Sequence, residues 1–294
     1  VRRVDYTNRK VWYEPCKNEK EDTFKGANVV PKDPRFMAQR EGRLYIAGSD
    51  DNDDTVYITD SGNPYYFPVV LSMQLPPNSD RISGLSVFNN AIIVGRRFDV
   101  HAITGDTNRT DAGLPVFRLH KLNSHTGVAS HHSMVNAHNY LIYLGTDSQF
   151  YALRVTDAGI DVLATQEISK NIDIHSKPIN VKKEDLWYAS GIFYQNCYYV
   201  TIGDKILVYH YDHQGWTVYD QINARCFYDL SNVLIMGDAN GRTVMPSTNF
   251  LDNGKPYRAY WTSKNFDMGE PTTYKMFRDF FVVTRSVTDY VSRV

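Results

Sequence analysis

The sequence predicts an all-β fold, a β-propeller of five or six four-stranded blades, from a repeated phrase, its period and the composition. A strand-turn-strand phrase that ends in glycine occurs five times, at residues 43–48, 91–95, 140–145, 197–203 and 233–237. The copies recur about every 48 residues, which is the length of one blade with its loops. The chain of 294 residues contains 21 Tyr and 14 Phe, which suit pleated strands, and it has no compelling long helix.

Each repeat predicts a meander of four strands. The strands of the first repeat are expected at 35–40, 44–47, 55–59 and 65–71, and those of the second at 82–88, 91–96, 100–104 and 116–121. Those of the third are expected at 132–136, 140–144, 149–154 and 160–167, and those of the fourth at 186–193, 197–202, 205–211 and 216–221. The fifth repeat predicts strands at 224–229, 233–236, 242–245 and 256–263.

Asparagine marks one of the turns within these meanders. Asn89-Asn90 separates two strands by two residues, the length of a tight hairpin turn, and Asn tolerates the positive φ that such a turn requires. Repeated hairpins also build sandwiches and up-and-down barrels. A repeat unit of four strands rather than two favours the propeller, whose closure would remove exposed sheet edges.

The chain is expected to have three parts. Residues 1–34 form an N-terminal segment with one strand at 10–13, which is predicted to pair with the end of the repeats and close the propeller of residues 35–263. Residues 264–294 are expected to form an exit strand and the start of a further β domain. Because the strand predicted at 280–285 has no obvious partner, we expect the protein to continue beyond Val294.

Charge and cysteine content exclude several classes of protein. The formal net charge of −1 provides no long-range field for tight, nonspecific binding of nucleic acid. Three cysteines without a CxxC spacing argue against a disulfide framework or a zinc knuckle, so free thiols are expected. No membrane segment or secretory leader is apparent, which predicts a soluble protein that is not secreted.

Two polar clusters contain residue types that can bind metal ions. The acidic turn from Asp50 to Asp54 offers the oxygen ligands that calcium prefers, but it lacks the glycine and the distal glutamate of an EF-hand, so a solvated turn is expected. Five histidines occur close together, at His120, His125, His131, His132 and His138. Strand alternation predicts that His131 and His132 point to opposite faces, which argues against a zinc site.

Motifs for catalysis are missing from the chain. There is no Gly-x-Ser-x-Gly elbow, no phosphate-cradling loop, no sialidase Asp-box and no WD40 signature. Six tyrosines are crowded into the fourth repeat, at Tyr188, Tyr194, Tyr198, Tyr199, Tyr209 and Tyr211. They could stack on bases or sugars, but strand positions favour core packing. No catalytic, cofactor-binding or metal-ligating residue is assigned, and no cofactor is expected.

Four phrases, taken in their order along the chain, resemble a known family. They are residues 42–48 with 55–68, residues 82–85 with 90–105, residues 127–135 with 141–147, and residues 260–269 followed by Lys275. The family is that of the tail nozzle or tail tubular proteins of short-tailed phages, with the related proteins that plug the tail and stabilise packaged DNA. The resemblance covers about residues 40–150 and 257–284, whereas the repeat at 186–221 matches only in pattern.

The resemblance implies a non-enzymatic structural protein of the virion, a tail nozzle, hub or head-to-tail subunit. Such subunits form a ring, usually a hexamer, around the channel through which DNA is ejected. The implied partners are other copies of the chain, neighbouring tail or connector proteins, and DNA that passes without sequence recognition. The implied location is the phage tail, after synthesis in the cytoplasm of the host bacterium. The family transfers no functional residue, because it has no catalytic motif.

Two other functions remain open at this point. One is a tail adhesin or glycan hydrolase, which would require carboxylates and aromatic residues gathered in a central pocket. The other is a general protein-interaction propeller, which would show an exposed apolar or aromatic patch without forming a ring.

Overall fold

The computed structural model describes residues 2–5, 10–13, 31–77, 80–109, 115–122, 124, 126–156, 159–170, 172–177, 179–220, 222–246, 259–260, 269–270, 272–276, 279 and 281. The chain divides into two units, Val1–Pro246 and Ser247–Val294. Every strand that the described residues form belongs to the first unit. No helix among the described residues is long and apolar enough to cross a membrane.

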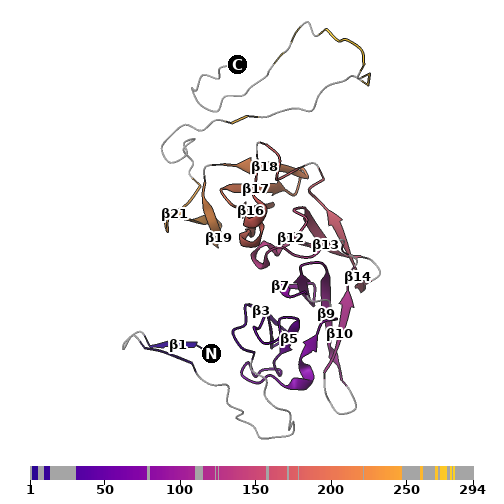
Figure 1. The fold of residues 1–294 in the computed structure, drawn as a ribbon, viewed down its shortest axis with the longest axis vertical. Helices are drawn as coiled ribbons and strands as arrows, with labels where there is room; N and C mark the ends of the chain where they lie inside the picture. The colour runs from indigo at the N-terminus through magenta and orange to yellow at the C-terminus, as the bar shows by residue number, and fades with distance from the viewer. Residues whose placement is uncertain are drawn as a thin grey trace. The chain divides into compact units, whose positions relative to one another are not determined.

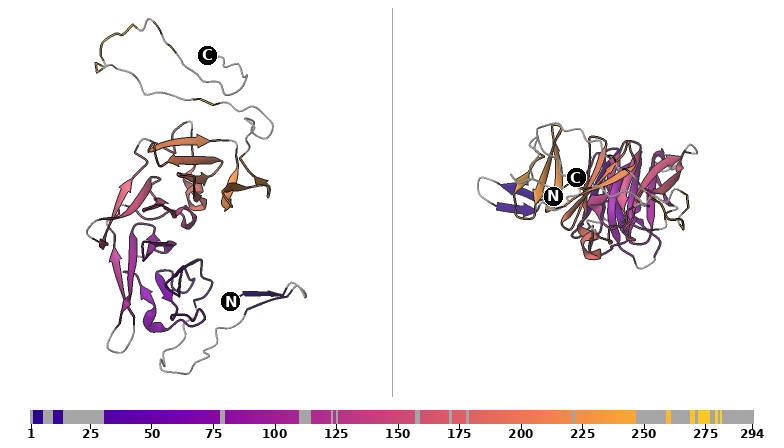
Figure 2. Two further views of the ribbon diagram at one scale, coloured as in Figure 1. Left: turned by 180° about the vertical axis from the view of Figure 1, so that it is seen from behind. Right: turned by 90° about the horizontal axis from the view of Figure 1, so that it is seen from above.

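Five antiparallel sheets follow one another along the first unit (Figures 1 and 2). Sheet 1 contains β3 (Phe36–Arg40), β4 (Arg43–Ala47), β5 (Thr55–Ile58) and β6 (Met73–Gln74). Sheet 2 contains β7 (Ile82–Phe88), β8 (Ala91–Arg96), β9 (Val100–Arg109) and β10 (Pro115–Lys121). Sheet 3 contains β11 (Val135–Ala137), β12 (Tyr140–Leu144), β13 (Phe150–Thr156) and β14 (Gly159–Glu167).

Sheet 4 contains β15 (Ser190–Tyr194), β16 (Cys197–Ile202), β17 (Lys205–His210) and β18 (Gly215–Tyr219). Sheet 5 contains β19 (Ala224–Leu230), β20 (Val233–Asp238) and β21 (Thr243–Val244), which are its three strands within the described part of the chain. In each sheet the strands pair in the order in which they occur in the sequence. Short 3₁₀ helices occur at η1 (Val69–Leu71), η2 (His131–Ser133) and η3 (Lys183–Tyr188).

The sheets pack as the blades of a propeller. Strand β3 contacts β7, β7 contacts η2 directly before β11, β11 contacts β15, and β15 contacts β19. The first strands of successive sheets are therefore neighbours, which is the arrangement of innermost strands in a propeller. An apolar cluster fills each junction between consecutive sheets. The prediction of an all-β propeller is confirmed.

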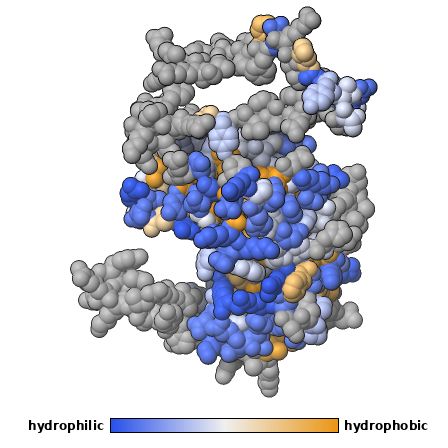
Figure 3. Space-filling view, turned by 45° about the horizontal axis from the view of Figure 1, so that its top comes forward, coloured by the Kyte–Doolittle hydropathy of each residue, from blue (hydrophilic) through white to orange (hydrophobic). Residues whose placement is uncertain are grey.

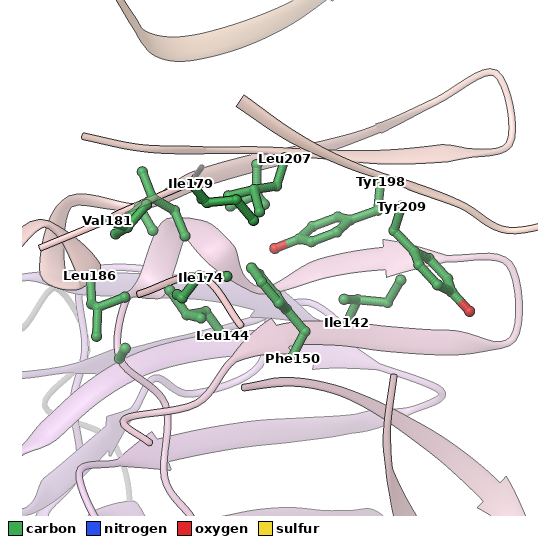
Figure 4. Close-up of a cluster of buried hydrophobic side chains, with 14 of the residues drawn as sticks. Ile142, Leu144, Phe150, Ile174, Ile179, Val181, Leu186, Tyr198, Leu207 and Tyr209 are labelled. Carbon is green, nitrogen blue, oxygen red and sulfur yellow. The ribbon is translucent and has the colours of Figure 1, made fainter. Parts of the chain in front are cut away.

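The junction between sheets 3 and 4 has the largest of these clusters (Figure 4). Phe150 of β13 and Tyr198 of β16 are both buried, and their rings lie 6.1 Å apart in an edge-to-face contact. The Tyr198 hydroxyl donates a hydrogen bond to the Ser133 carbonyl at 2.9 Å, so its polar end is also satisfied. Core packing was correctly predicted for Tyr198.

Hydroxyl side chains link the sheets in a regular way. Ser83 donates a hydrogen bond to the carbonyl of Val128, and Thr201 donates one to the carbonyl of Ala224, each at 2.6 Å. Ser130 donates an equivalent bond to Ala189, also at 2.6 Å. Each acceptor carbonyl belongs to the chain that enters the next sheet, so these bonds fasten consecutive sheets at their entry points.

The glycine that ends each repeated phrase has a structural cause. Gly48 and Gly203 have φ values of 72° and 63°, in the left-handed region that glycine enters without strain. At Gly95 the cause is space, because a Cβ atom there would lie 2.5 Å from the side chain of Val128 in the next sheet. The repeat therefore reflects both turn geometry and close packing between sheets.

The Asn89-Asn90 turn is confirmed, with φ values of 41° and 62°. The same pair of positive φ values occurs at residues 195–196 and 231–232, between the first and second strands of sheets 4 and 5. Two consecutive residues with positive φ define the tight turn whose twist matches that of the flanking strands.

Several predicted strand positions were wrong. The last strand of sheet 1 lies at Met73–Gln74 and not at 65–71, because Pro64 and Pro68 lack the N–H group that a strand ladder needs, and Val69–Leu71 form η1. The starts predicted at 132 and 186 fall in η2 and η3, and strands β11 and β15 begin at Val135 and Ser190. The strands predicted at 256–263 and 280–285 lie outside the described residues, apart from residues 259, 260 and 281.

The predicted N-terminal strand is confirmed as β2 (Lys10–Tyr13), and it pairs with β1 (Arg2–Asp5) in an antiparallel hairpin. The closure of the propeller by this segment stays a prediction, as does the domain boundary at residue 263.

Candidate functional site

A pocket of about 260 Å³ lies between sheets 3 and 4. Strands β12, β13 and β14 and the residues after β14 supply one side, and β17 and the turn after it supply the other. The lining residues are Tyr140, Ile142, Ala152, Gln166, Glu167, Ile168, Lys170, Tyr209, Tyr211 and Gln214. The first strands of the sheets do not contribute, so the pocket is a cleft between two blades and not a central cavity.

Apolar and polar groups are separated within this tyrosine pocket, the name used below for the residues just given. Ile142, Ala152 and Tyr209 are buried, whereas Gln166 and Gln214 are exposed. Buried side chains and exposed polar side chains thus both line the pocket. The two sides are joined by Trp216, whose indole N–H donates a hydrogen bond to the Ile168 carbonyl at 3.0 Å.

Aromatic rings from the two sides of the pocket contact each other. The rings of Tyr140 and Tyr211 lie 5.9 Å apart, and His138 lies 5.3 Å from Tyr211. Burial raises the pKa of Tyr209 and of Tyr211, and the neighbouring tyrosines raise them further. Their hydroxyl groups therefore stay protonated at neutral pH and can both donate and accept hydrogen bonds.

The chemistry of these side chains is more compatible with binding a neutral, hydroxyl-rich ligand than with catalysing its hydrolysis. Aromatic faces pack against the C–H groups of a sugar ring, and glutamine, glutamate and lysine can hydrogen-bond to its hydroxyl groups. Hydrolysis of a glycosidic bond requires two carboxylates, and Glu167 is the one carboxylate among the described residues that line the pocket. The described residues that line the pocket therefore do not supply a hydrolytic pair.

The histidines do not form a metal site in the described part of the chain, where no group of three or more His, Cys, Asp or Glu side chains could hold an ion. The prediction that His131 and His132 face opposite ways was wrong. Both lie in η2, and their rings are 4.9 Å apart. His138 instead contacts Asn196 at 2.9 Å, His120 contacts Thr104 at 3.1 Å, and His125 lies outside the described residues.

His131 is a packed, neutral histidine. Its Nδ1 accepts a hydrogen bond from the Leu85 N–H at 3.3 Å, and its ring lies 5.0 Å from that of Phe36. Burial lowers the pKa of His131 to about 4, and the neighbouring His132 contributes in the same direction.

The acidic turn has structural partners. Asp50 forms an ion pair with Arg35 at 2.9 Å, and Asp54 accepts hydrogen bonds from Thr55 and Gln74 at 3.1 Å each. The Asp54 carboxylate thus links β5 to β6. These contacts agree with the solvated turn that the sequence predicts.

One contact of chemical interest was missed by sequence reasoning. Cys197 and His210 are paired across β16 and β17, with Sγ and Nδ1 3.3 Å apart, and His210 Nε2 lies 3.0 Å from the Thr217 hydroxyl. Burial and the nearby Asp212 raise the pKa of the Cys197 thiol. A raised pKa disfavours the thiolate, so this pair does not have the character of an activated nucleophile.

A second surface feature is an aromatic patch formed by Arg97, Phe98, Trp187 and Tyr188. The Arg97 guanidinium lies 5.3 Å from the ring centre of Phe98 and 5.8 Å from that of Trp187. Phe98 and Tyr188 are 65% and 77% exposed. Tryptophan, tyrosine and arginine are the residue types that dominate the energetics of protein interfaces. The described residues on the face of the molecule in Figure 3 are mostly hydrophilic, with small apolar areas.

Comparison with known proteins gives neither a matching family model nor a matching curated protein. Among solved structures, the chain is similar to BamB from Moraxella catarrhalis, with 12% identity over 76% of this chain and 69% of that chain and a TM-score of 0.41. It is similar to the WD40 β-propeller domain of Doa1, with 11% identity over 74% of this chain and 64% of that chain and a TM-score of 0.41. It is also similar to the Pan2 WD40 domain of Neurospora crassa, with 9% identity over 72% of this chain and 59% of that chain and a TM-score of 0.40.

Proposed function

We propose that this chain is a non-enzymatic structural subunit of a phage tail, part of a ring around the DNA exit channel. The observation that carries the proposal is the order of the family-like phrases. Residues 42–68, 82–105 and 127–147 fall in sheets 1, 2 and 3 in turn, and each range includes the second strand of its sheet.

The contacts of these phrases are those of a scaffold. Gly95 belongs to the second phrase and makes room for Val128 of the third, and Ser83 of the second donates a hydrogen bond to the same Val128. A formal net charge of −1 suits a channel protein that must let DNA slide past without holding it.

The test is the oligomeric state of the protein, measured by light scattering and negative-stain electron microscopy. The proposal expects rings of constant subunit number that form as concentration rises. A protein that stays monomeric at all concentrations and binds a host glycan would refute it.

A second candidate function, binding of host-surface carbohydrate, is favoured by the tyrosine pocket. Tyr211 lines the pocket and is only partly buried, so Tyr211→Ala should remove a stacking surface with little effect on folding. Tyr188→Ala is the matched control, because Tyr188 is also exposed and lies outside the pocket.

The measurement is binding to a panel of bacterial surface oligosaccharides, followed by calorimetry on any positive. Carbohydrate binding at this pocket predicts that Tyr211→Ala weakens affinity by about tenfold or more, as expected for loss of a stacking contact, while Tyr188→Ala does not. Equal affinity in the two variants would rule out the pocket as the site.

A further inference from the structure

Within the described part of the chain, the two end sheets of the propeller each leave one apolar face uncovered. Sheets 2, 3 and 4 each contribute residues to two of the apolar clusters, one cluster on each face. Sheet 1 and sheet 5 contribute to one cluster each. In a closed propeller every sheet is packed on both sides, so the outer faces of sheets 1 and 5 are where a further layer would lie.

Register identifies the uncovered face of sheet 5. Residues directly opposite each other in an antiparallel pair share a face. Phe227 pairs with Met236, and both pack against sheet 4. The opposite face therefore carries Tyr228 with its partner Ile235, and Leu230 with its partner Val233.

This open face, defined as Tyr228, Leu230, Val233 and Ile235, is apolar and accessible. Tyr228, Leu230 and Val233 are 63%, 51% and 44% exposed. Such a cluster of large apolar side chains on one sheet face marks a surface that is covered in the functional protein. Cys226 lies at the end of the same face, paired with Gly237, and is an exposed free thiol.

Sheet 1 shows the matching feature. Tyr45 pairs with Ala38 on the face that packs against sheet 2, whereas Met37 pairs with Ile46 on the opposite face. Met37 is 64% exposed, and Ile46 is half-buried. Both ends of the row of sheets thus present apolar side chains that none of the other described sheets covers.

We propose that the N-terminal hairpin of β1 and β2 inserts between these two end faces, covers the open face of sheet 5 and closes the ring. The hairpin precedes sheet 1 in the chain, which places it at the end of the row that must be joined to sheet 5. An isolated two-stranded sheet is marginally stable in water, so this hairpin needs a surface to pack on. Its strands contain Val4, Val11, Trp12 and Tyr13.

The connection is long enough to allow this placement. Residues 14–35 join β2 to β3, and a chain of that length spans up to about 70 Å when extended. That reach exceeds the width of a domain of this size, which is roughly 40 to 50 Å. A second copy of the chain is the competing occupant of the open face.

Cys226 provides a direct probe of coverage in the full chain. The probe is N-ethylmaleimide under native conditions, with labelling of each cysteine followed by peptide mass spectrometry. The matched variant is Val11→Pro, which places a residue with a fixed φ and no N–H group opposite Val4 and so disrupts the pairing of β2 with β1. Cys226 should react about tenfold faster or more in Val11→Pro, because the covering layer is lost. An equal rate in both proteins would overturn the proposal.

Substitutions on the face give an independent readout. Leu230→Glu should lower Tm by about 5 to 10 °C if the face is covered, because a charge would then be buried. The control is Val70→Glu, at a site that is 60% exposed on η1, and its Tm should change by less than about 2 °C. In a protein that already carries Val11→Pro, Leu230→Glu should lower Tm only slightly further.

Two outcomes would contradict the hairpin as occupant. If Leu230→Glu behaves like Val70→Glu, the open face is uncovered. If Cys226 becomes protected as protein concentration rises and Val11→Pro has no effect, a second copy covers the face.

Discussion

A buried ion pair at the turn between β8 and β9 leads to a specific prediction about stability. The Arg96 guanidinium binds both carboxylate oxygens of Asp99, with Nε–Oδ1 and Nη2–Oδ2 distances of 2.7 and 2.8 Å. Arg96 Nη1 also donates a hydrogen bond to the Pro76 carbonyl at 2.8 Å, in the chain that leads from sheet 1 to sheet 2. Arg96 and Asp99 are 1% and 4% exposed.

We expect Asp99→Asn to destabilise the protein by about 3 to 5 kcal/mol, because it leaves the Arg96 charge buried without its counter-ion. For a domain of this size each kcal/mol lowers Tm by about 2 to 4 °C, so Tm should fall by roughly 6 to 20 °C. The control is Asp50→Asn, which breaks the exposed Arg35–Asp50 pair at 2.9 Å and should cost less than about 1 kcal/mol.

The effect should depend on pH. Burial by itself would raise the pKa of Asp99, but the hydrogen bond from Arg96 and the nearby His101, Arg96 and Lys121 charges outweigh it and lower that pKa below the ordinary 3.8. A lowered folded-state pKa means that the carboxylate stabilises the fold above pH 3.8 and that this contribution is lost as pH falls through the folded-state pKa. Urea denaturation of both variants at pH 7 and in acid tests this. Equal losses for Asp99→Asn and Asp50→Asn at pH 7 would refute the reasoning.

Three further predictions concern packing and titration. Gly95→Ala should lower the free energy of unfolding by about 1 to 3 kcal/mol, because the new Cβ would lie 2.5 Å from Val128. The control is Gly215→Ala, where the nearest atom is 3.9 Å away, and it should change the free energy of unfolding by about 0.5 kcal/mol or less. Thr201→Val should cost about 1 to 3 kcal/mol in urea denaturation, because the buried Ala224 carbonyl loses its donor, and a loss no larger than that of exposed Thr217→Val would contradict this. His131 has a pKa of about 4 against the ordinary 6.5, so stability should be greatest above pH 6.5, fall by about 2 to 3 kcal/mol as pH drops to 4, and level off below it. His131→Gln should flatten that part of the profile, and an unchanged slope would show that another group is responsible.

The strands could be predicted because their signal is local. Each apolar run and each two-residue turn lies within a few dozen residues, and alternation fixes the face of every side chain. The errors also have local causes. The residues from Tyr65 to Leu71 have the apolar composition of a strand. The prolines on either side of Tyr65-Tyr66-Phe67 lack the backbone N–H groups that a strand ladder needs, and the prediction did not take this into account. Alternation failed at His131 and His132 because a 3₁₀ turn, not a strand, enters sheet 3.

The candidate site could not be predicted in the same way. Tyr140 and Tyr211 are far apart in the sequence, and they meet only because sheets 3 and 4 pack against each other. No periodicity within one sheet encodes that contact. The Cys197–His210 pair was accessible from the sequence, because the turn at Gly203-Asp204 fixes the register of β16 and β17.

The tyrosine pocket and the aromatic patch are therefore both formed by residues from different sheets or their connections, and not by residues within one sheet. The tyrosine pocket joins sheets 3 and 4, and the aromatic patch joins the turn after β8 to η3. This separates the two functional hypotheses physically. A ring subunit would meet its neighbours through residues that are exposed in the isolated chain, such as Phe98 and Tyr188, whereas a carbohydrate would enter the cleft at Tyr211. Because the two sets of residues do not overlap, substitutions in one leave the other intact, and assembly and sugar binding can be tested independently.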